Sequence, residues 1–255
     1  MFNDAYQAVC SGAKGKANLL KKNPLGFFVS SMMAGLFIAF GGFISIGISA
    51  PFYEAGDPMQ KVMNSASFAV ALSFVLMCGA ELFTGSNFVL GAAGFRKELS
   101  WGEIVKIWVI TYIGNLVGSL LAVAVYQFSG VPTGTVAELF AAAAEKKMTT
   151  GPLALICKGI LCNTLVCMAV WCNTKMKYES GKLIMIFCCI FTFMICGFEH
   201  SIANMTTMAV GLLNPGTANV SIGGYIYNLV CVTIGNMIGG VLVVALPYHL
   251  ISKEK

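Results

Sequence analysis

Long apolar stretches alternate with short polar segments along the 255 residues of the chain. A transmembrane helix needs about 20 consecutive apolar residues to cross the hydrocarbon core of a bilayer. Six stretches are long enough, at residues 25–49, 64–95, 104–128, 152–174, 183–213 and 224–251. The pattern predicts an all-α integral membrane protein with six transmembrane helices. We expect one transmembrane domain over residues 1–255, in which residues 1–24 form a cytoplasmic N-terminal segment.

The second and fifth stretches are longer than a single span requires. About 32 apolar residues would form a helix of roughly 48 Å, whereas the hydrocarbon core is about 30 Å thick. Both stretches contain polar and small residues at their middle: residues 79–85 read GAELFTG and residues 197–204 read GFEHSIAN. Each segment begins with Gly-x-Glu and continues with small polar residues, which loosen a helix. We therefore predict that the second and fifth helices are broken.

A second pair of matched signatures follows the first pair at nearly the same separation. Residues 112–118 read YIGNLVG and residues 233–239 read TIGNMIG. Two matched signatures indicate a duplicated unit of three spans, over residues 25–128 and 152–251. A three-span unit crosses the membrane an odd number of times, so the second copy is predicted to be inverted, as in many transporters and channels.

Composition and charge support a membrane protein. Hydrophobic residues make up 57% of the chain and charged residues 11%, whereas a soluble domain is about one quarter charged. Twelve basic residues precede the first span, follow the last, or lie between spans two and three and between four and five: Lys14, Lys16, Lys21, Lys22, Arg96, Lys97, Lys106, Lys175, Lys177, Lys182, Lys253 and Lys255. The opposite loops hold only Lys61, Lys146 and Lys147. This asymmetry predicts cytoplasmic termini, and we expect a multi-pass protein of the bacterial inner (cell) membrane that binds no nucleic acid.

Four charged or imidazole side chains fall well inside the apolar stretches, away from their ends: Glu81, Lys158, Glu199 and His200. A charge at the bilayer centre costs about 3 kcal/mol or more unless it is paired or hydrated. Because the two glutamates recur at equivalent places in both repeats, we expect them to support the breaks by accepting freed backbone N–H groups. The residues assigned to broken-helix support are Glu81, Glu199, Asn204, Asn163 and Asn236.

His200 has no counterpart in the first repeat, where Leu82 follows the glutamate. The asymmetry favours a functional role, although a buried histidine that only satisfies its hydrogen bonds is the alternative. We predict that His200 and Thr84 form the centre of a pore. A neutral imidazole can donate a hydrogen bond to an anion and a protonated one can attract it, and a hydroxyl can donate or accept. The N-terminal ends of the half-helices would add partial positive charge.

Bulky apolar side chains accompany this polar centre. Leu72 precedes Leu82 by about three helical turns and Phe193 precedes His200 by about two, so each pair lies on one side of its helix. We predict that Leu72, Leu82 and Phe193 form hydrophobic constrictions. Simple packing or lipid contact is the alternative for each of them. Lys147 is predicted to raise the anion concentration in an outer vestibule, with an ordinary solvated lysine as the alternative.

Four motifs carry a resemblance to a known family: residues 79–85, 162–171 (CNTLVCMAVW), 197–205 (GFEHSIANM) and 232–240 (VTIGNMIGG). With them the chain resembles the formate/nitrite transporter family, and within it the bacterial hydrosulfide ion channel branch. The resemblance implies an aquaporin-like fold and a homopentamer with one pore per protomer. Its motifs also place the family's central histidine and loop threonine on His200 and Thr84, its slit residues on Leu72, Leu82 and Phe193, and its vestibule lysine on Lys147.

The function expected from residues and resemblance together is a channel or transporter for small monovalent anions, hydrosulfide first, with formate and nitrite also permeant. Proton symport of formate or nitrite and a neutral-solute pore of aquaporin type remain open alternatives. A membrane thiol oxidoreductase would need a positioned cysteine pair, and among ten cysteines without a C-x-x-C spacing only Cys188 and Cys189 come close. A structural scaffold would have no evident use for a polar centre. We expect no enzymatic activity, cofactor or metal.

Overall fold

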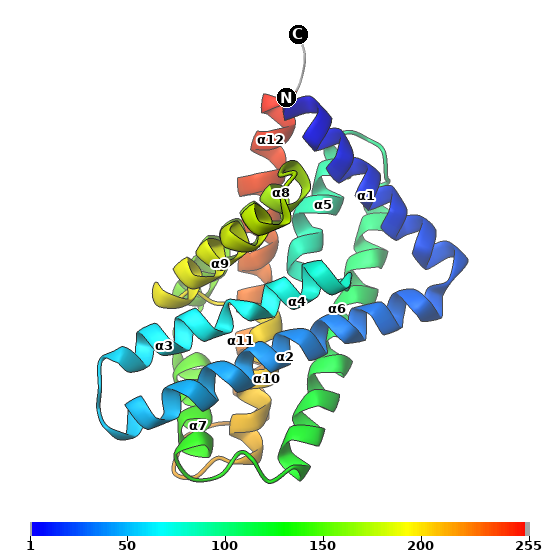
Figure 1. The fold of residues 1–255 in the computed structure, drawn as a ribbon. Coiled ribbons are helices and arrows are strands. Elements are labelled where there is room, and N and C mark those ends of the chain that lie inside the picture. Colours follow the sequence, from blue (N-terminus) through cyan, green and yellow to red (C-terminus); the bar gives the residue numbers. More distant parts are fainter. Residues whose placement is uncertain (1, 253–255) are drawn as a thin grey trace.

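The computed structural model describes residues 2–252, which form helices and short connections without a strand. In Figure 1 the helices follow one another as α1 (Phe2–Lys22), α2 (Pro24–Glu54), α3 (Met59–Phe68), α4 (Val70–Cys78), α5 (Phe83–Phe95), α6 (Trp101–Phe128), α7 (Gly134–Thr149), α8 (Pro152–Lys175), α9 (Glu179–Ile195), α10 (Ser201–Leu213), α11 (Ile222–Ile238) and α12 (Leu246–Ile251). A π-helical turn, Gly239–Ala245, joins the last two. The all-helical prediction is therefore confirmed for the described residues.

Five helical segments of the described chain are long and apolar enough to cross a membrane. They are α2, α3 together with α4 (Met59–Cys78), α6, α8, and α11 through α12 (Ile222–Ile251). The stretch expected as the fifth span is divided between α9, of 17 residues, and α10, of 13 residues. Several apolar helices of this length indicate a multi-pass membrane protein.

Both predicted interruptions are present, between α4 and α5 and between α9 and α10 (Figure 1). Gly79 follows α4 with a φ of 74°, and Gly197 lies just after α9 with a φ of 72°. In both places the residue after the glycine closes the helix end with a hydrogen bond to a carbonyl oxygen five residues earlier. Ala80 N–H donates to the Val75 carbonyl, and Phe198 N–H donates to the Phe193 carbonyl. Left-handed backbone strains any residue that carries a Cβ, so the glycine of each Gly-x-Glu is the residue that ends its helix.

α5 and α10, the short helices that follow the breaks, lie inside the bundle. Every residue from Phe83 to Gly94 is buried. In contrast, the longer helices expose apolar side chains such as Val105, Val125 and Ile226. Apolar outer faces are expected where helices contact lipid or another chain. The short helices that follow the breaks are consequently enclosed by the long helices.

Glycines allow the long helices to touch through their backbones. A Cβ added to Gly118 of α6 would lie 1.9 Å from the carbonyl oxygen of Met32 in α2. A Cβ added to Gly235 of α11 would lie 2.3 Å from the carbonyl oxygen of Ile156 in α8. Both glycines belong to the repeated G-x-x-x-G signatures, which permit such close approach.

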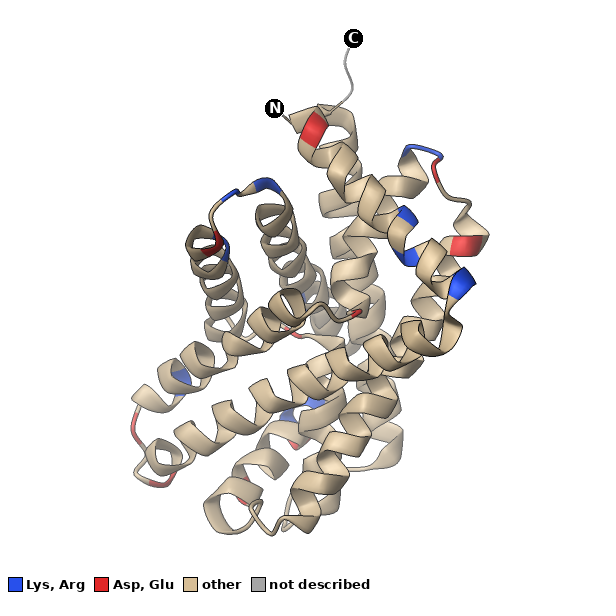
Figure 2. Cartoon of the chain, turned by 45° about the vertical axis from the view of Figure 1, so that its right-hand side comes forward, with Lys and Arg blue, Asp and Glu red and all other residues tan. Residues whose placement is uncertain are grey.

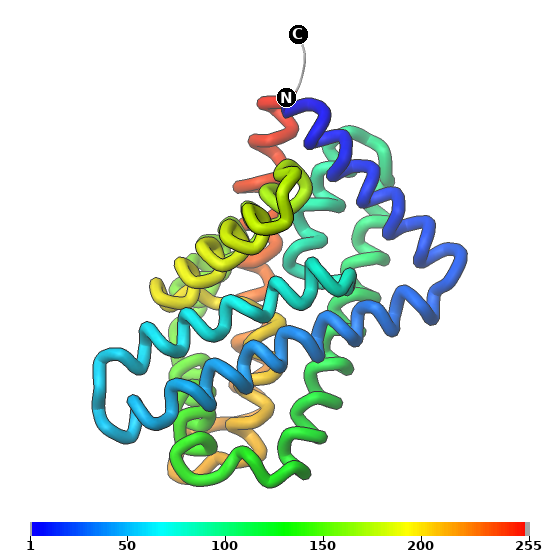
Figure 3. Tube along the Cα trace, viewed as in Figure 1, coloured from blue at the N-terminus to red at the C-terminus, as the bar shows by residue number. Residues whose placement is uncertain are grey.

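α1 is an amphipathic helix outside the candidate spans. Tyr6, Cys10, Ala13 and Leu20 form its buried face, at the spacing of one helical side. Figure 2 shows that most of the basic and acidic residues lie on α1, in the connections or near the ends of helices, and that long parts of the other helices carry none. Figure 3 shows that α1 begins and α12 ends at the same end of the molecule.

Candidate functional site

The two helix breaks meet at a hydrogen bond between Thr84 and His200. Thr84 lies in the first turn of α5, and His200 directly precedes α10 as its N-cap. Thr84 Oγ1 is 2.9 Å from His200 Nε2. The two residues are 0% and 4% exposed. The sequence therefore singled out two residues that are in contact, and their role in permeation remains a prediction.

The second ring nitrogen of His200 fixes the direction of this hydrogen bond. Nδ1 accepts from the backbone N–H of Ala203 at 3.1 Å. A ring nitrogen that accepts a hydrogen bond carries no proton, so the neutral ring holds its proton on Nε2. Nε2–H then donates to Thr84 Oγ1, and the hydroxyl hydrogen of Thr84 is left for another acceptor. A second ring proton would have to bind at Nδ1, and this would break the hydrogen bond from Ala203 N–H.

Aromatic side chains cover one side of the histidine. Phe193 of α9 stacks on His200 with ring centroids 6.0 Å apart, and Phe68 of α3 meets Phe193 edge-on at 6.1 Å. Phe68, Leu72, Leu82 and Phe193 belong to one buried hydrophobic cluster. Phe68 was not predicted from the sequence. Phe68 lies four residues before Leu72, about one helical turn away, so the sequence did indicate that both side chains lie on the same side of the helix.

Asn236 of α11 closes the break in front of α10. Its Oδ1 accepts from the backbone N–H of Ser201 at 2.9 Å. Its Nδ2 donates to the carbonyl oxygens of Glu199 at 3.0 Å and Gly159 at 2.9 Å. One side chain thus satisfies the Ser201 N–H and the Glu199 carbonyl at the break and also bonds to the Gly159 carbonyl of α8.

Asn115 of α6 does the same in the first break. Its Oδ1 accepts from Phe83 N–H at 2.9 Å, and its Nδ2 donates to the carbonyl oxygens of Ser31 and Glu81, both at 2.8 Å. Asn115 was missing from the predicted support residues, although its position in the matched YIGNLVG signature was a usable signal.

The expectation that the glutamate carboxylates accept backbone N–H groups at the breaks was wrong. Among the described residues, the asparagines accept these N–H groups, and Glu81 and Glu199 contribute their backbone carbonyls. An amide both donates and accepts, so it can satisfy an N–H and a C=O together. A carboxylate only accepts, and its charge requires a partner of its own.

Lys147 of α7 supplies that partner for Glu199. The Nζ–Oε2 distance is 2.8 Å, and Asn204 Nδ2 donates to the same oxygen at 2.7 Å. Asn204 Nδ2 also donates to Asn228 Oδ1 at 2.8 Å. Glu199 is 7% exposed, so the pair is largely removed from water. Lys147 lines a cavity, as expected for a vestibule residue, but the carboxylate of Glu199 compensates its charge there.

Lys16 of α1 is the corresponding partner of Glu81, and the two side chains form an ion pair. Both are mostly buried, with 19% and 14% of their side-chain surfaces exposed. Sequence reasoning missed this contact because α1 lies outside the expected spans. A buried carboxylate requires a counter-ion, so the sequence indicated that Glu81 has a basic partner. It did not indicate which lysine that partner is.

Asn163 of α8 joins the two breaks. Its Nδ2 has three acceptors within reach, the Thr84 carbonyl at 3.2 Å, Asn87 Oδ1 at 3.1 Å and the Asn236 carbonyl at 2.7 Å. It is fully buried. Asn163 therefore holds the backbone of Thr84 close to the helix that carries Asn236.

A cavity of about 370 Å³, here called the vestibule, extends to His200 from between α3, α7 and α8. Its charged lining residues are Lys61, Lys146, Lys147, Lys158 and Glu199. Four lysines against one glutamate leave an excess of three positive charges. Lys158 forms no ion pair among the described residues, and its backbone carbonyl accepts from Glu199 N–H at 3.3 Å. The vestibule can therefore attract anions to the polar centre.

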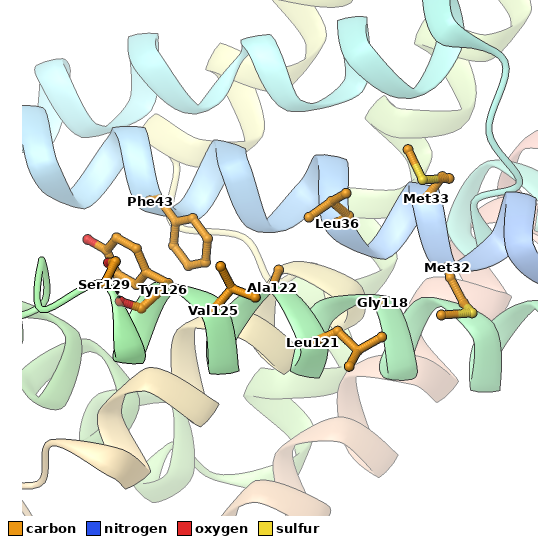
Figure 4. A pocket seen from close by; sticks show the side chains of 10 residues that line it. All are labelled: Met32, Met33, Leu36, Phe43, Gly118, Leu121, Ala122, Val125, Tyr126 and Ser129. Atoms are coloured by element: carbon orange, nitrogen blue, oxygen red, sulfur yellow. Dashed lines mark hydrogen bonds between the residues drawn. The ribbon is translucent and has the colours of Figure 1, made fainter.

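A cavity of about 380 Å³ between α2 and α6 has a different character (Figure 4). Its lining is Met32, Met33, Leu36, Phe43, Gly118, Leu121, Ala122, Val125, Tyr126 and Ser129. Only two hydroxyl groups and no charge are available there, so it does not suit an anion. Of these two cavities, only the vestibule is polar and reaches the Thr84–His200 pair.

Known proteins resemble the chain over nearly its whole length. The family model described as formate/nitrite transporter matches residues 3–250. The nitrite transporter NirC of Escherichia coli (strain K12) is 34% identical over 252 residues, which cover 97% of this chain and 91% of that protein.

Two solved structures share the fold. An FNT family ion channel has a TM-score of 0.92 at 32% identity, over 98% of this chain and 99% of that one. A pentameric formate channel with formate bound has a TM-score of 0.81 at 27% identity, over 91% of this chain and 98% of that one. Sequence and fold agree over nearly the whole chain, which therefore belongs to the formate/nitrite transporter family.

Proposed function

We propose that the chain forms a pore for small monovalent anions, with hydrosulfide as its first substrate and formate and nitrite also permeant. The observation that carries the proposal is a vestibule with an excess of three lysines that ends at the Thr84–His200 hydrogen bond. A neutral-solute pore of aquaporin type would have no use for this positive charge.

In the proposed pathway an anion is concentrated in the vestibule and then loses water beside Phe193 and Phe68. Apolar walls admit small, weakly hydrated ions at the least cost, which favours hydrosulfide. Leu72 and Leu82 belong to the same buried cluster and act in the proposal as further constrictions. The partial positive charge at the N-terminal ends of α5 and α10 offsets part of the lost hydration.

At the polar centre the Thr84 hydroxyl donates to the anion, because His200 Nε2–H already donates to Thr84 Oγ1. The bond from Ala203 N–H to Nδ1 supports a role of the neutral ring as a donor. Proton symport of formate or nitrite requires the ring to take up and release a proton, and hence to break that bond. We therefore place passive conduction ahead of symport.

The proposed architecture has six spans in two inverted repeats, residues 25–128 and 152–251, in an aquaporin-like arrangement. The equivalent bonds of Asn115 and Asn236 support the repeat. The relative described as a pentameric formate channel supports a homopentamer. The lysine distribution supports cytoplasmic termini in a bacterial inner membrane.

Anion flux into proteoliposomes tests the proposal, with hydrosulfide, formate, nitrite and chloride compared between pH 5 and 8. Wild type should conduct the first three, and His200→Asn should lose most of the flux. Empty liposomes correct for neutral hydrogen sulfide, which crosses lipid unaided. Equal flux of wild type and His200→Asn at every pH would exclude the role of His200. Glycerol flux without anion flux would establish the neutral-solute pore instead.

A further inference from the structure

A third cavity, of about 480 Å³, lies between α1 and the beginning of α6. Its lining is Lys14, Ala17, Asn18, Leu20, Lys21, Leu99, Glu103, Lys106 and Ile107. It shares no lining residue with the vestibule. The anion pathway therefore does not account for its charges.

Two of the three lysines in this cavity are uncommitted. Lys14 pairs with Glu98 at 2.9 Å. Lys21 and Lys106 are exposed and form no ion pair among the described residues. The one carboxylate in the lining, Glu103, accepts from the hydroxyl and the backbone N–H of Ser100, as part of the capping box that begins α6. Three lysines and one carboxylate line the cavity, so its lining carries an excess of positive charge.

Apolar side chains form another part of the same lining. Leu20 and Ile107 are 9% and 2% exposed, and Leu99 is half-buried beside them. An inorganic anion would use only the lysines of this mixed lining. An amphiphile with an anionic head and hydrocarbon chains would use both parts of it.

The cavity also lies at the depth where lipid headgroups are expected. α6 begins at Trp101 and continues as a candidate span of 28 residues, so its first two turns, which hold Lys106, lie at one end of the membrane segment. Trp101 is 45% exposed, as is common for tryptophan at a membrane interface. The amphipathic α1 forms the other wall.

We propose that this cavity binds the phosphate group of an anionic phospholipid. Lys21 and Lys106 hold the phosphate, and the apolar part of the lining, where Leu99 is half-buried, contacts the glycerol and the beginning of the acyl chains. Each lysine near a lipid phosphate strengthens binding about fivefold, so the two together contribute on the order of 20-fold.

Native mass spectrometry of the full chain in detergent tests this site, with dioctanoyl phosphatidylglycerol as the titrated lipid. The variant Lys21→Ser with Lys106→Ser should bind it about 20-fold more weakly than wild type. The matched control, Lys177→Ser with Lys182→Ser, removes the same charge from lysines that line none of the three cavities and should bind like wild type. Equal affinity of the two double variants would overturn the proposal.

Two further titrations separate the sources of the phosphate. Dioctanoyl phosphatidylcholine should bind more weakly than phosphatidylglycerol, and inorganic phosphate at equal concentration should not displace the lipid. Displacement by inorganic phosphate would identify an ion site and refute the lipid. Lys21→Arg with Lys106→Arg should retain binding, and its loss there would contradict a site based on charge. Equal melting temperatures of all variants without lipid verify that each one is folded.

Discussion

Asn115 and Asn236 make the same set of hydrogen bonds in the two halves of the chain. Each Oδ1 accepts the first backbone N–H of a buried half-helix, and each Nδ2 donates to the carbonyl of the break glutamate and to one carbonyl of a neighbouring helix. The neighbouring helices are α2 for Asn115 and α8 for Asn236, which the glycine contacts also bring close. Each asparagine therefore connects a broken helix to a rigid helix pair.

Asn236→Leu should destabilise the protein by about 3 kcal/mol, because it leaves the buried Ser201 N–H and the Glu199 carbonyl without partners. Thermal unfolding in detergent measures the effect, and Asn115→Leu should behave alike. Asn173→Leu, at a half-buried position of α8, is the control and should melt close to wild type. An Asn236→Leu protein that melts with this control would contradict the assigned role.

Thr84→Val keeps the shape of the side chain and removes the hydroxyl that His200 contacts. Anion flux in proteoliposomes should fall about tenfold, which corresponds to one lost hydrogen bond at the highest barrier. Thr84→Ser restores the hydroxyl and should restore most of the flux. If valine and serine conduct alike, the hydroxyl does not contact the anion.

Removal of one member of the Lys147–Glu199 pair should lower the stability of the protein more than removal of both. Lys147→Met leaves a carboxylate that is 7% exposed with only the Asn204 amide, and should cost about 3 kcal/mol. Adding Glu199→Gln removes the unpaired charge and should recover most of the melting temperature. Additive effects of the two substitutions would show that the pair is not coupled.

Lys158→Met should lower anion flux several-fold at low ionic strength and much less at 1 M salt, where charges are screened within about 3 Å. Lys158 lines the vestibule, whereas Lys182 does not, so Lys182→Met is the matched control. Flux measured at both salt concentrations separates electrostatic attraction from altered packing. A salt-independent loss in Lys158→Met would argue for packing.

Cys10 in α1 gives an alkaline dependence of stability. Burial, and then the nearby Glu98, raise the pKa of its thiol to about 11, against the opposing effect of Arg96 and Lys14. The folded chain therefore holds a proton that the unfolded chain releases above about pH 9. Stability from this thiol is complete below pH 9 and is lost as the pH rises toward 11. Melting temperatures of Cys10→Ala should fall less than those of wild type across this interval, and parallel curves would refute the effect.

The breaks were predictable because their signals are local. Gly79 and Gly197 require left-handed backbone, and each Gly-x-Glu stands inside a stretch too long for one span. Thr84 and His200 lie in different breaks of the two repeats, and this predicted that they are close once the repeat was recognised. Their contact distance, the ring stacking of Phe193 and the direction of the hydrogen bond needed the three-dimensional structure.

The ion pairs were not predictable because they join segments far apart in the sequence. Nothing in residues 1–24 marks Lys16 among its neighbours Lys14 and Lys21, and only packing of α1 against the helix bundle selects it. Lys147 was recognised as a vestibule residue, but its pairing with Glu199 depends on the approach of α7 to the second break.

The hydrogen bond from His200 to Thr84 bears on the sign of the ion in the proposed pore. Nε2–H occupies a lone pair of the threonine hydroxyl, which is then unavailable to coordinate sodium or potassium. The threonine carbonyl is likewise engaged, by Asn163. A cation at this depth would therefore find fewer free oxygen lone pairs than the two groups carry. The hydrogen-bond directions at Thr84 thus favour an anion over a cation without any fixed charge on the ring.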